Sequence, residues 1–203
     1  LDEVKEAAKN NGGRMFYVTD LRSQSFYVEL FKKEGQQAVL LGGPVDDMFI
    51  SFLEYKNPGL TFARIDADVA QAVKGEYEDL PDAAVLESLM KKASGNDQLK
   101  VEVAPIKDGD VLSMLVINES DRRFYDMALR YGNGMPAVPP SAKLVLNGAS
   151  PVIQKLAKET DEEKAGLIAA YVYDLALIGC GRMDQKQAAG FFQRAAKVLS
   201  LIG

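Results

Sequence analysis

The stretch from Thr160 to Gly203 constrains the fold most, because it predicts two helices that carry more apolar surface than a hairpin can bury by itself. The first helix begins with Thr160 as N-cap and Glu163 three residues later, the pattern of a capping box. Its apolar residues recur at three- and four-residue spacing and form two faces. One face consists of Ile168, Tyr171, Val172, Leu175 and Ile178, and the other of Leu167, Ala170 and Leu177.

The second helix starts near Asp184, after Gly179-Cys180-Gly181, and has one apolar stripe opposite a polar side. Two interpretations stay open: the hairpin completes the core of its own domain, or it pairs with a second copy into a four-helix bundle. A dimer would use apolar residues of both helices. The candidate interface consists of Leu167, Ile168, Tyr171, Val172, Leu175, Phe191, Phe192, Ala195, Leu199 and Ile202.

Composition and charge exclude several function classes. The 203 residues are 47% hydrophobic and 26% charged, which is ordinary for a globular protein. The net charge of -5, without a basic stripe, argues against nucleic-acid and anionic-membrane partners, and no apolar run reaches the roughly 18 residues of a membrane span. The absence of histidine excludes Ser-His-Asp and Cys-His catalysis and histidine-bound zinc. The single cysteine suits a reducing compartment, so we expect a cytoplasmic protein.

The first third of the chain alternates between helix and strand patterns. Strands are predicted at Met15–Thr19, Ala38–Leu41 and Leu60–Ile65, each next to an amphipathic helix. This alternation predicts right-handed crossovers and a small three-stranded parallel sheet in an α-β-α sandwich. In the last of these helices, Asp46 to Tyr55, we expect the core side to contain Phe49, Ile50, Phe52 and Leu53.

A change of composition between Asp66 and Pro81 predicts two domains, residues 1–68 and 81–203, joined by a linker over 69–80. The second domain reads as mixed α/β, so the chain combines the α/β and α+β classes. Its predicted elements are a helix over 82–93, a β-hairpin with strands at 99–103 and 111–117 around Asp108-Gly109, a helix over 121–131, a strand over 143–147, a short helix over 151–157 and the terminal helical hairpin.

The helix from Asp121 to Tyr131 carries apolar side chains all round rather than on one stripe. Methionine and aromatic residues without a clear polar face suit an adaptable binding surface, while burial within the domain is the equally weighted alternative. Met48, in the predicted helix from Asp46 to Tyr55, could extend this surface. The candidate binding residues are Met48, Phe124, Met127, Leu129, Tyr131 and Met135.

Other motifs carry little chemistry. Gly42-Gly43-Pro44 lies where doubly wound folds bind phosphate, but it lacks a nucleotide-binding glycine pattern and is followed by two aspartates, so a tight turn is expected. The acidic runs at 76–79 and 108–110 lack the spaced ligands of a calcium loop. Cys180 has no nearby base and is expected to fill space. We predict no catalytic, cofactor-binding or metal-binding residue in this chain.

The order and spacing of several segments resemble the ninety-kilodalton heat-shock chaperone family of the bacterial HtpG type. The segments are the helix of Asp2–Asn10 with Met15-Phe16-Tyr17-Val18-Thr19, then Val28 to Gly35, Ala38-Val39-Leu40-Leu41, Pro44-Val45-Asp46-Asp47 and Phe52-Leu53, and later Met135-Pro136, Pro139-Pro140, Leu144 to Asn147, Tyr173 to Leu177 and Phe191-Phe192-Gln193-Arg194. The sequence departs from the family at Ala104-Pro105-Ile106-Lys107, where the family usually has Ser-x-Arg-Leu and Ser-Pro.

The resemblance implies the end of the family's middle domain followed by its C-terminal dimerisation domain. It also implies a homodimer that binds partly folded client proteins, with co-chaperones as further partners. ATP and Mg²⁺ would bind the full-length protein upstream of this chain, which begins without methionine inside a helix pattern and is expected to be a piece. Two alternatives remain: a ligand-binding or enzymatic doubly wound α/β module, and a structural dimer adaptor.

Overall fold

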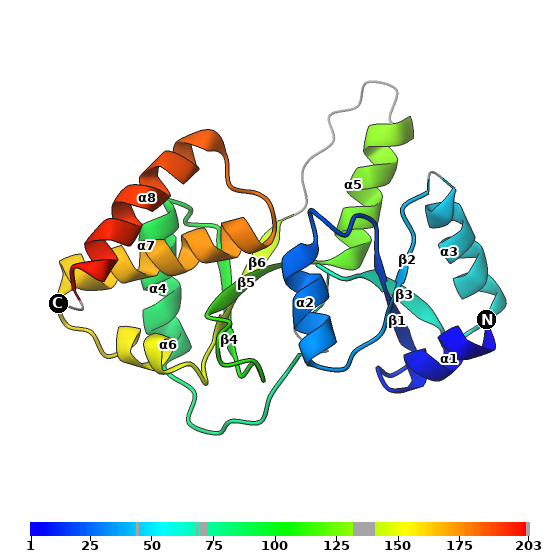
Figure 1. Ribbon diagram of the computed structural model, residues 1–203, viewed down its shortest axis with the longest axis horizontal. Helices are drawn as coiled ribbons and strands as arrows, with labels where there is room; N and C mark the ends of the chain where they lie inside the picture. The colour runs from blue at the N-terminus through cyan, green and yellow to red at the C-terminus, as the bar shows by residue number, and fades with distance from the viewer. Residues whose placement is uncertain (44, 68, 70–72, 132–140, 202–203) are drawn as a thin grey trace. The chain divides into compact units, whose positions relative to one another are not determined.

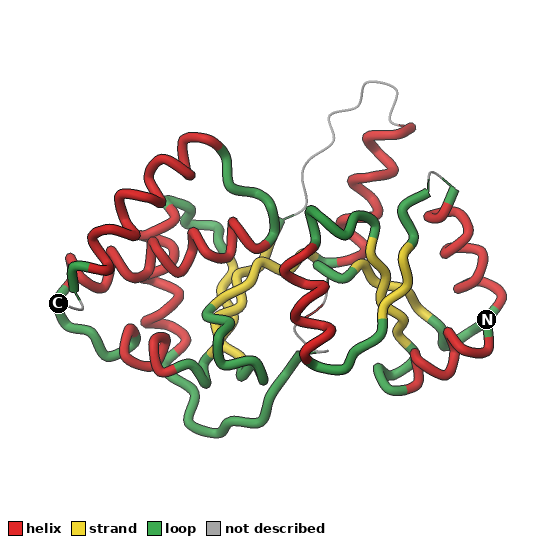
Figure 2. The backbone as a smooth tube through the Cα atoms, in the orientation of Figure 1, coloured by secondary structure: helices red, strands yellow, loops and turns green. Residues whose placement is uncertain are grey.

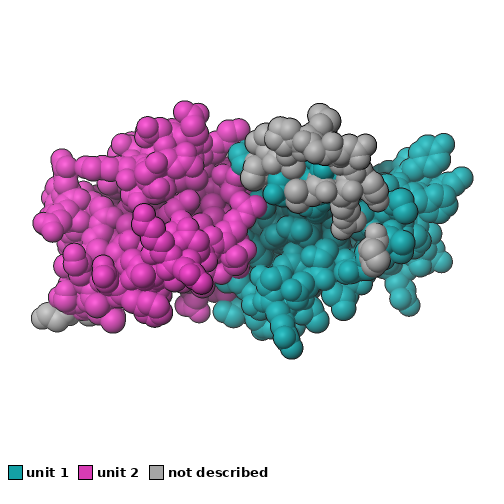
Figure 3. All heavy atoms as spheres, turned by 90° about the horizontal axis from the view of Figure 1, so that it is seen from above, with its two compact units in different colours: residues 1–73, 117–141 teal, residues 74–116, 142–203 magenta. Residues whose placement is uncertain are grey.

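The computed structural model describes residues 1–43, 45–67, 69, 73–131 and 141–201. The chain forms two compact units (Figure 3), of which unit 1 contains residues 1–73 and 117–141, and unit 2 contains residues 74–116 and 142–203. Helices and strands alternate over the first third of the chain, in unit 1, whereas unit 2 begins with one helix, continues with its strands and ends with three helices (Figure 2). The predicted mixture of α/β and α+β structure is confirmed.

Unit 1 is built on a parallel three-stranded sheet with the order β2-β1-β3 (Figure 1). The register pairs Phe16 with both Ala38 and Ala63, so β1 is central. Each crossover contains a helix, as the sequence predicts. The elements are α1 Asp2–Lys9, β1 Arg14–Val18, α2 Ser25–Lys33, β2 Ala38–Leu40, α3 Asp46–Lys56, β3 Thr61–Arg64 and, from further along the chain, α5 Glu119–Tyr131.

The two faces of this sheet have separate apolar cores. On one face, Phe16 of β1 meets Phe31 of α2 edge-on, with ring centroids 4.9 Å apart. On the other face, the buried side chains of Met15 and Tyr17 pack with Ile50 of α3 and with α1. Burial on both faces explains why β1 is a continuous apolar run rather than an alternating one.

Helix α5 groups with unit 1, although the sequence places residues 121–131 with the second domain. Polar side chains join this helix to the rest of unit 1: Glu119, Arg122 and Arg123 hydrogen-bond to residues of β1, α3 and β3. These pairs join positions far apart in the sequence. No local sequence pattern predicts these long-range pairs.

Unit 2 has a second three-stranded sheet with the order β4-β6-β5, in which β4 runs parallel to β6. Its elements are α4 Ala83–Ser94, β4 Lys100–Ala104, β5 Ser113–Ile117 (whose last residue belongs to unit 1), β6 Ala142–Asn147, α6 Pro151–Leu156, α7 Glu162–Gly179 and α8 Gln185–Leu199. Helices α4 and α7 pack on the sheet's main apolar core, which includes Leu86, Leu144 and Val172.

The predicted β-hairpin between β4 and β5 is wrong, because β6 lies between these strands. Leu144, Val145 and Leu146 of β6 are completely buried, as a central strand requires. The loop around Asp108 is held instead by Asn147, whose side chain accepts from Ile106 N–H at 3.0 Å and donates to Val111 O at 2.9 Å.

The helix starts follow their capping residues. The N-cap of α7 is Asp161, whose carboxylate accepts from Glu163 N–H and Lys164 N–H, so the predicted cap at Thr160 is wrong by one residue. The predicted start of α8 at Asp184 is confirmed by a capping box with Gln187. Among the described helices, none has the length and apolar character needed to cross a membrane.

Candidate functional site

Helix α3 is apolar on two sides, and the sheet can cover only one of them. Ile50 faces the core and is 1% exposed. The opposite stripe is open to solvent, which corrects our expectation that Phe49 and Phe52 are buried. The exposed fractions on this stripe run from 50% to 80%, at Val45, Met48, Phe49, Phe52 and Tyr55. A helix with apolar residues all round was the sequence signal for such a second face.

A buried ionic network fixes the start of α5 against β1. The Arg122 guanidinium donates to Glu119 at 2.7 Å and to the Tyr17 hydroxyl at 2.5 Å, and it also pairs with Asp126. The Arg122 side chain is only 4% exposed. Such a charge is tolerated in the interior because each nitrogen of the guanidinium group has a hydrogen-bond acceptor.

A second arginine links the same helix to α3 and β3. Arg123 Nη1 donates to Glu54 at 2.8 Å, and its Nε donates to Glu119 at 2.7 Å. Its Nη2 also donates to the backbone oxygen of Phe62 at 2.6 Å. The side chains of α3 and α5 therefore hold the outer edge of β3 as well as each other.

The environment of Glu119 changes its acidity in two opposing ways. Burial raises the pKa of this carboxyl. Hydrogen bonds and positive charge from Arg122 and Arg123, together with the hydrogen bond from Arg64 N–H, lower the pKa by more than burial raises it. The net result is a pKa below the ordinary range. Burial also raises the pKa of Tyr17, with a further increase from the Glu119 charge, so this phenol stays protonated at neutral pH.

We expect the network to lose stability in acid. Because the pKa of Glu119 is lower in the folded than in the unfolded protein, its contribution is complete above the unfolded value of about 4.3 and is lost as pH falls through the folded value. Carboxyl carbon NMR should show Glu119 titrating below the ordinary glutamate range. The Arg122→Gln variant should raise this pKa, and an unchanged titration there would contradict the assignment.

A cavity of about 330 Å³ lies between α3 and α5 within unit 1. Its lining brings together Met48 and Met127, two of the predicted binding residues, and also includes Ile50 of α3 and Arg122 and Asp126 of α5. Met48 is 64% exposed and Met127 is 52% exposed, so both thioethers stand at an open groove. The arginines here are already paired with carboxylates.

The other predicted binding residues either do not line this cavity or lie outside the part of the chain that the structure describes. Phe124 is 68% exposed on α5 and does not line the cavity. Met135 lies outside the described residues, as do the side chains of Leu129 and Tyr131. The residues that the sequence reasoning missed are Phe49, Phe52 and Tyr55, which continue the apolar surface along α3. Lys56 lies 5.8 Å from the Tyr55 ring centroid and 5.9 Å from that of Phe52.

The second candidate surface is the helical hairpin of unit 2, where α8 lies along α7 (Figure 1). Phe191 stacks on Tyr171 with the rings 5.6 Å apart and nearly parallel. Arg194 holds the buried carboxylate of Asp174 through two hydrogen bonds, one of 2.8 Å. These contacts attach α8 by one side only, and no residue of this helix is buried.

The outward side of α8 remains apolar. Phe192 is 71% exposed and Leu199 is 67% exposed. Val172, in contrast, is completely buried in the core of unit 2, so it has no surface to offer a second copy. The remaining predicted interface residues, namely Leu167, Ile168, Tyr171, Leu175, Phe191 and Ala195, are half-buried, and Ile202 lies outside the described residues.

The loop before α3 has the geometry of a tight turn. A side chain on Gly42 would meet the backbone oxygen of Thr19 at 2.4 Å, which explains the glycine. The Asp46 carboxylate accepts from Gly43 N–H at 2.6 Å, so a side-chain anion already occupies the donor that a phosphate would need. Pro44 lies outside the described residues. Cys180, at the end of α7, is half-buried, and its thiol contacts the Leu177 oxygen at 3.4 Å.

Sequence comparison identifies similar curated proteins. Over 174 residues the chain is 32% identical to the chaperone protein HtpG of Desulfotalea psychrophila, an alignment that covers 76% of this chain and 27% of that protein. Over 220 residues it is 27% identical to the chaperone protein HtpG of Alkalilimnicola ehrlichii, covering 98% of this chain and 32% of that protein. The chain thus spans about a third or less of these relatives. No protein-family model matches it.

Proposed function

Because the chain is related to the HtpG-type chaperones of the ninety-kilodalton heat-shock family, we propose that it forms the part of an ATP-dependent chaperone that holds partly folded client proteins. One observation carries this proposal. The exposed apolar stripe of α3 and the open groove lined by Met48 and Met127 form one surface of unit 1. A folded protein keeps such a surface exposed mainly where something must bind.

The composition of this surface suits many weak ligands. Methionine side chains keep their rotamer freedom and a polarizable sulfur, so Met48 and Met127 can fit apolar segments of different shape. Phe49, Phe52 and Tyr55 add rigid apolar area along α3. The backbone that carries these residues is fixed by the Glu54–Arg123–Glu119 pairs, so a flexible surface rests on a rigid support.

The rest of the proposal concerns the longer protein. Residues 1–68 would be the end of the middle domain, 69–80 a linker, and 81–203 the dimerisation domain. The homodimer would form through α7 and α8 and would present the client surface twice, which raises avidity. ATP, Mg²⁺ and the catalytic groups would belong to segments outside this chain. Co-chaperones would be further partners, and the protein would be located in the cytoplasm.

The test is the double variant Met48→Ser with Met127→Ser. We expect it to suppress the aggregation of thermally denatured citrate synthase at least threefold less well than the parent chain, measured by light scattering. Both side chains are more than half exposed, so the melting temperature should change little.

A matched control is Val85→Ser, which removes a 41% exposed apolar side chain from α4 of unit 2. It should retain full holding activity. Equal activity of the double variant and the parent chain would exclude this groove as the client site. A large drop in the melting temperature of the double variant would instead show that the two methionines stabilise the fold.

A further inference from the structure

The two edge strands of the sheet in unit 1 differ in whether their outward backbone groups are hydrogen-bonded. The outer edge of β3 is occupied by side chains: Glu54 accepts from Phe62 N–H at 2.7 Å, Arg123 donates to Phe62 O at 2.6 Å, and Glu119 accepts from Arg64 N–H at 3.1 Å. Occupying edge groups in this way prevents another strand from pairing there. The β3 edge is therefore closed.

The edge formed by β2 is open. Leu41 N–H donates to Val18 O at 2.8 Å, and backbone groups in a parallel ladder alternate in direction along the strand. Val39 therefore faces β1, while the N–H and C=O groups of Ala38 and Leu40 point away from the sheet. In the described part of the chain, no group outside the sheet hydrogen-bonds to these two residues. The Leu40 side chain is 61% exposed.

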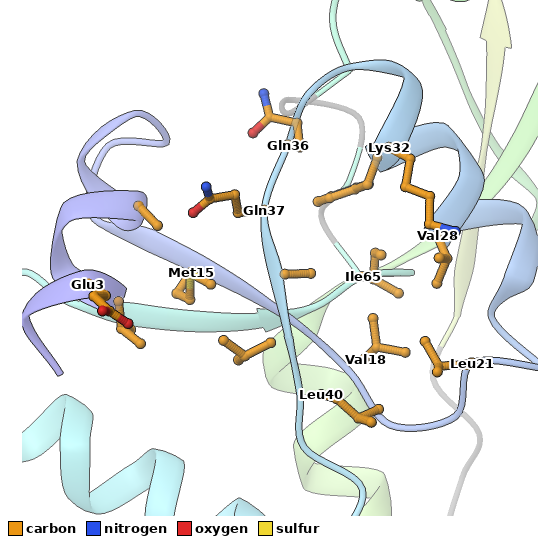
Figure 4. A pocket seen from close by; sticks show the side chains of 15 residues that line it. Glu3, Met15, Val18, Leu21, Val28, Lys32, Gln36, Gln37, Leu40 and Ile65 are labelled. Carbon is orange, nitrogen blue, oxygen red and sulfur yellow. The ribbon is translucent and has the colours of Figure 1, made fainter.

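A groove of about 490 Å³ follows this open edge (Figure 4). Val4 and Ala7 of α1 line one side, and Val28 and Phe31 of α2 line the other, so helices flank β2 on both faces of the sheet. Figure 4 shows Glu3 and Lys32 on opposite sides of the strand. Most of the groove lining is apolar, with Gln36 and Gln37 as its uncharged polar residues, an anion at one wall and a cation at the other.

We propose that this groove binds an extended polypeptide segment, which adds to β2 as a fourth strand. Backbone hydrogen bonds to Ala38 and Leu40 would provide affinity, and successive side chains of the segment would point alternately to the α1 wall and the α2 wall. The segment that fits is apolar at most positions, with a basic side chain toward Glu3 and an acidic one toward Lys32. Lys32 pairs with Glu29 at 2.7 Å, but both are about two-thirds exposed, so this pair exchanges readily.

A single strand fits this edge better than a second copy of the chain. The β2 edge of another copy would bring its own α1 and α2 to the same place, and four helices would have to share the space beside two short strands. An isolated segment brings no helices of its own and meets no such obstacle. The site is separate from the groove of Met48 and Met127, with which it shares no lining residue.

The probe is a fluorescein-labelled heptapeptide composed mainly of valine, so that both of its faces are apolar, with one lysine and one glutamate on opposite faces; its binding is measured by fluorescence anisotropy. We expect the parent chain to bind it and Ala38→Pro to bind it at least tenfold more weakly. Proline at this position removes an outward donor and obstructs the added strand without breaking the β1–β2 ladder. Ala38→Val keeps the donor and should bind like the parent, with circular dichroism confirming the fold of both variants.

A second measurement needs no variant. Methylating the alternate peptide nitrogens that face β2 should abolish binding, while methylating the other set should not. Equal effects of the two methylations, or full binding by Ala38→Pro, would overturn the proposal. The proposal would also be overturned if Ala38→Pro lowered the molecular mass of the assembly that the chain forms without peptide. A second copy of the chain would then occupy the edge. The Met48→Ser, Met127→Ser variant should bind the heptapeptide normally, so this result is independent of the client proposal.

Discussion

We expect Glu119→Ala to lower the free energy of unfolding of unit 1 by about 3–5 kcal/mol, because it leaves buried arginine charge without its main partner. Glu119 accepts from Arg122 at 2.7 Å, from Arg123 at 2.7 Å and from the backbone of Arg64 at 3.1 Å. The Arg122 side chain has almost no access to water that could replace the carboxylate. Urea denaturation followed by circular dichroism measures the loss.

Glu29→Ala is the matched control. Glu29 also pairs with a cation three residues away on a helix, but the Glu29 and Lys32 side chains are 66% and 67% exposed. Exposed pairs contribute at most about 1 kcal/mol, so this variant should unfold almost like the parent. Equal losses in the two variants would mean that the network around Arg122 does not hold the unit together.

The Glu119→Ala effect should be greatest at α5. This helix is joined to β1, α3 and β3 through the arginine network, so its amide hydrogens should exchange faster once Glu119 is gone. Loosening α5 also separates Met127 from Met48, which line the same groove. The variant should therefore hold citrate synthase less well even at temperatures where the sheet of unit 1 stays folded.

The fold of unit 1 was predictable because its signals are local. The residues of β1 at 15–18 and those of β2 at 38–40 are continuous apolar runs beside helices, and short parallel crossovers admit few topologies. The place of α5 was not predictable in this way. Its hydrogen bonds to Tyr17 join residues 102 and 105 positions apart, and nothing near Glu119 in the sequence indicates that partner.

The error at β4 and β5 has a similar origin. Asp108-Gly109 is a good turn signal, but a turn does not determine which strand pairs with which. β5 and residues 144–146 of β6 are both apolar and buried, so the apolar pattern alone did not indicate that β6 lies between β4 and β5. For the candidate site, the sequence identified Met48 and Met127 as unusual. It did not show that α3 turns Phe49 and Phe52 outward, because both of its faces are apolar.

Phe192→Asp and Leu199→Asp should each convert a dimer of this chain into a folded monomer. Both side chains lie seven residues apart on the outward side of α8, and both are about two-thirds exposed or more. A symmetric partner that covers them would bury on the order of 1,500 Å² in total. An aspartate placed inside that surface would lose its hydration without gaining a partner. Multi-angle light scattering at tens of micromolar should show the mass fall by half.

Gln193→Asp is the control, because it adds the same charge to an exposed position about 100° around the helix from Phe192. This variant should keep the mass of the parent chain. The folded monomer is expected because Tyr171–Phe191 stacking and the Asp174–Arg194 pair hold α8 on α7 within one chain, independent of Phe192. A parent chain that is already monomeric at this concentration would exclude the dimer, and the outward side of α8 would then be an unpaired apolar face.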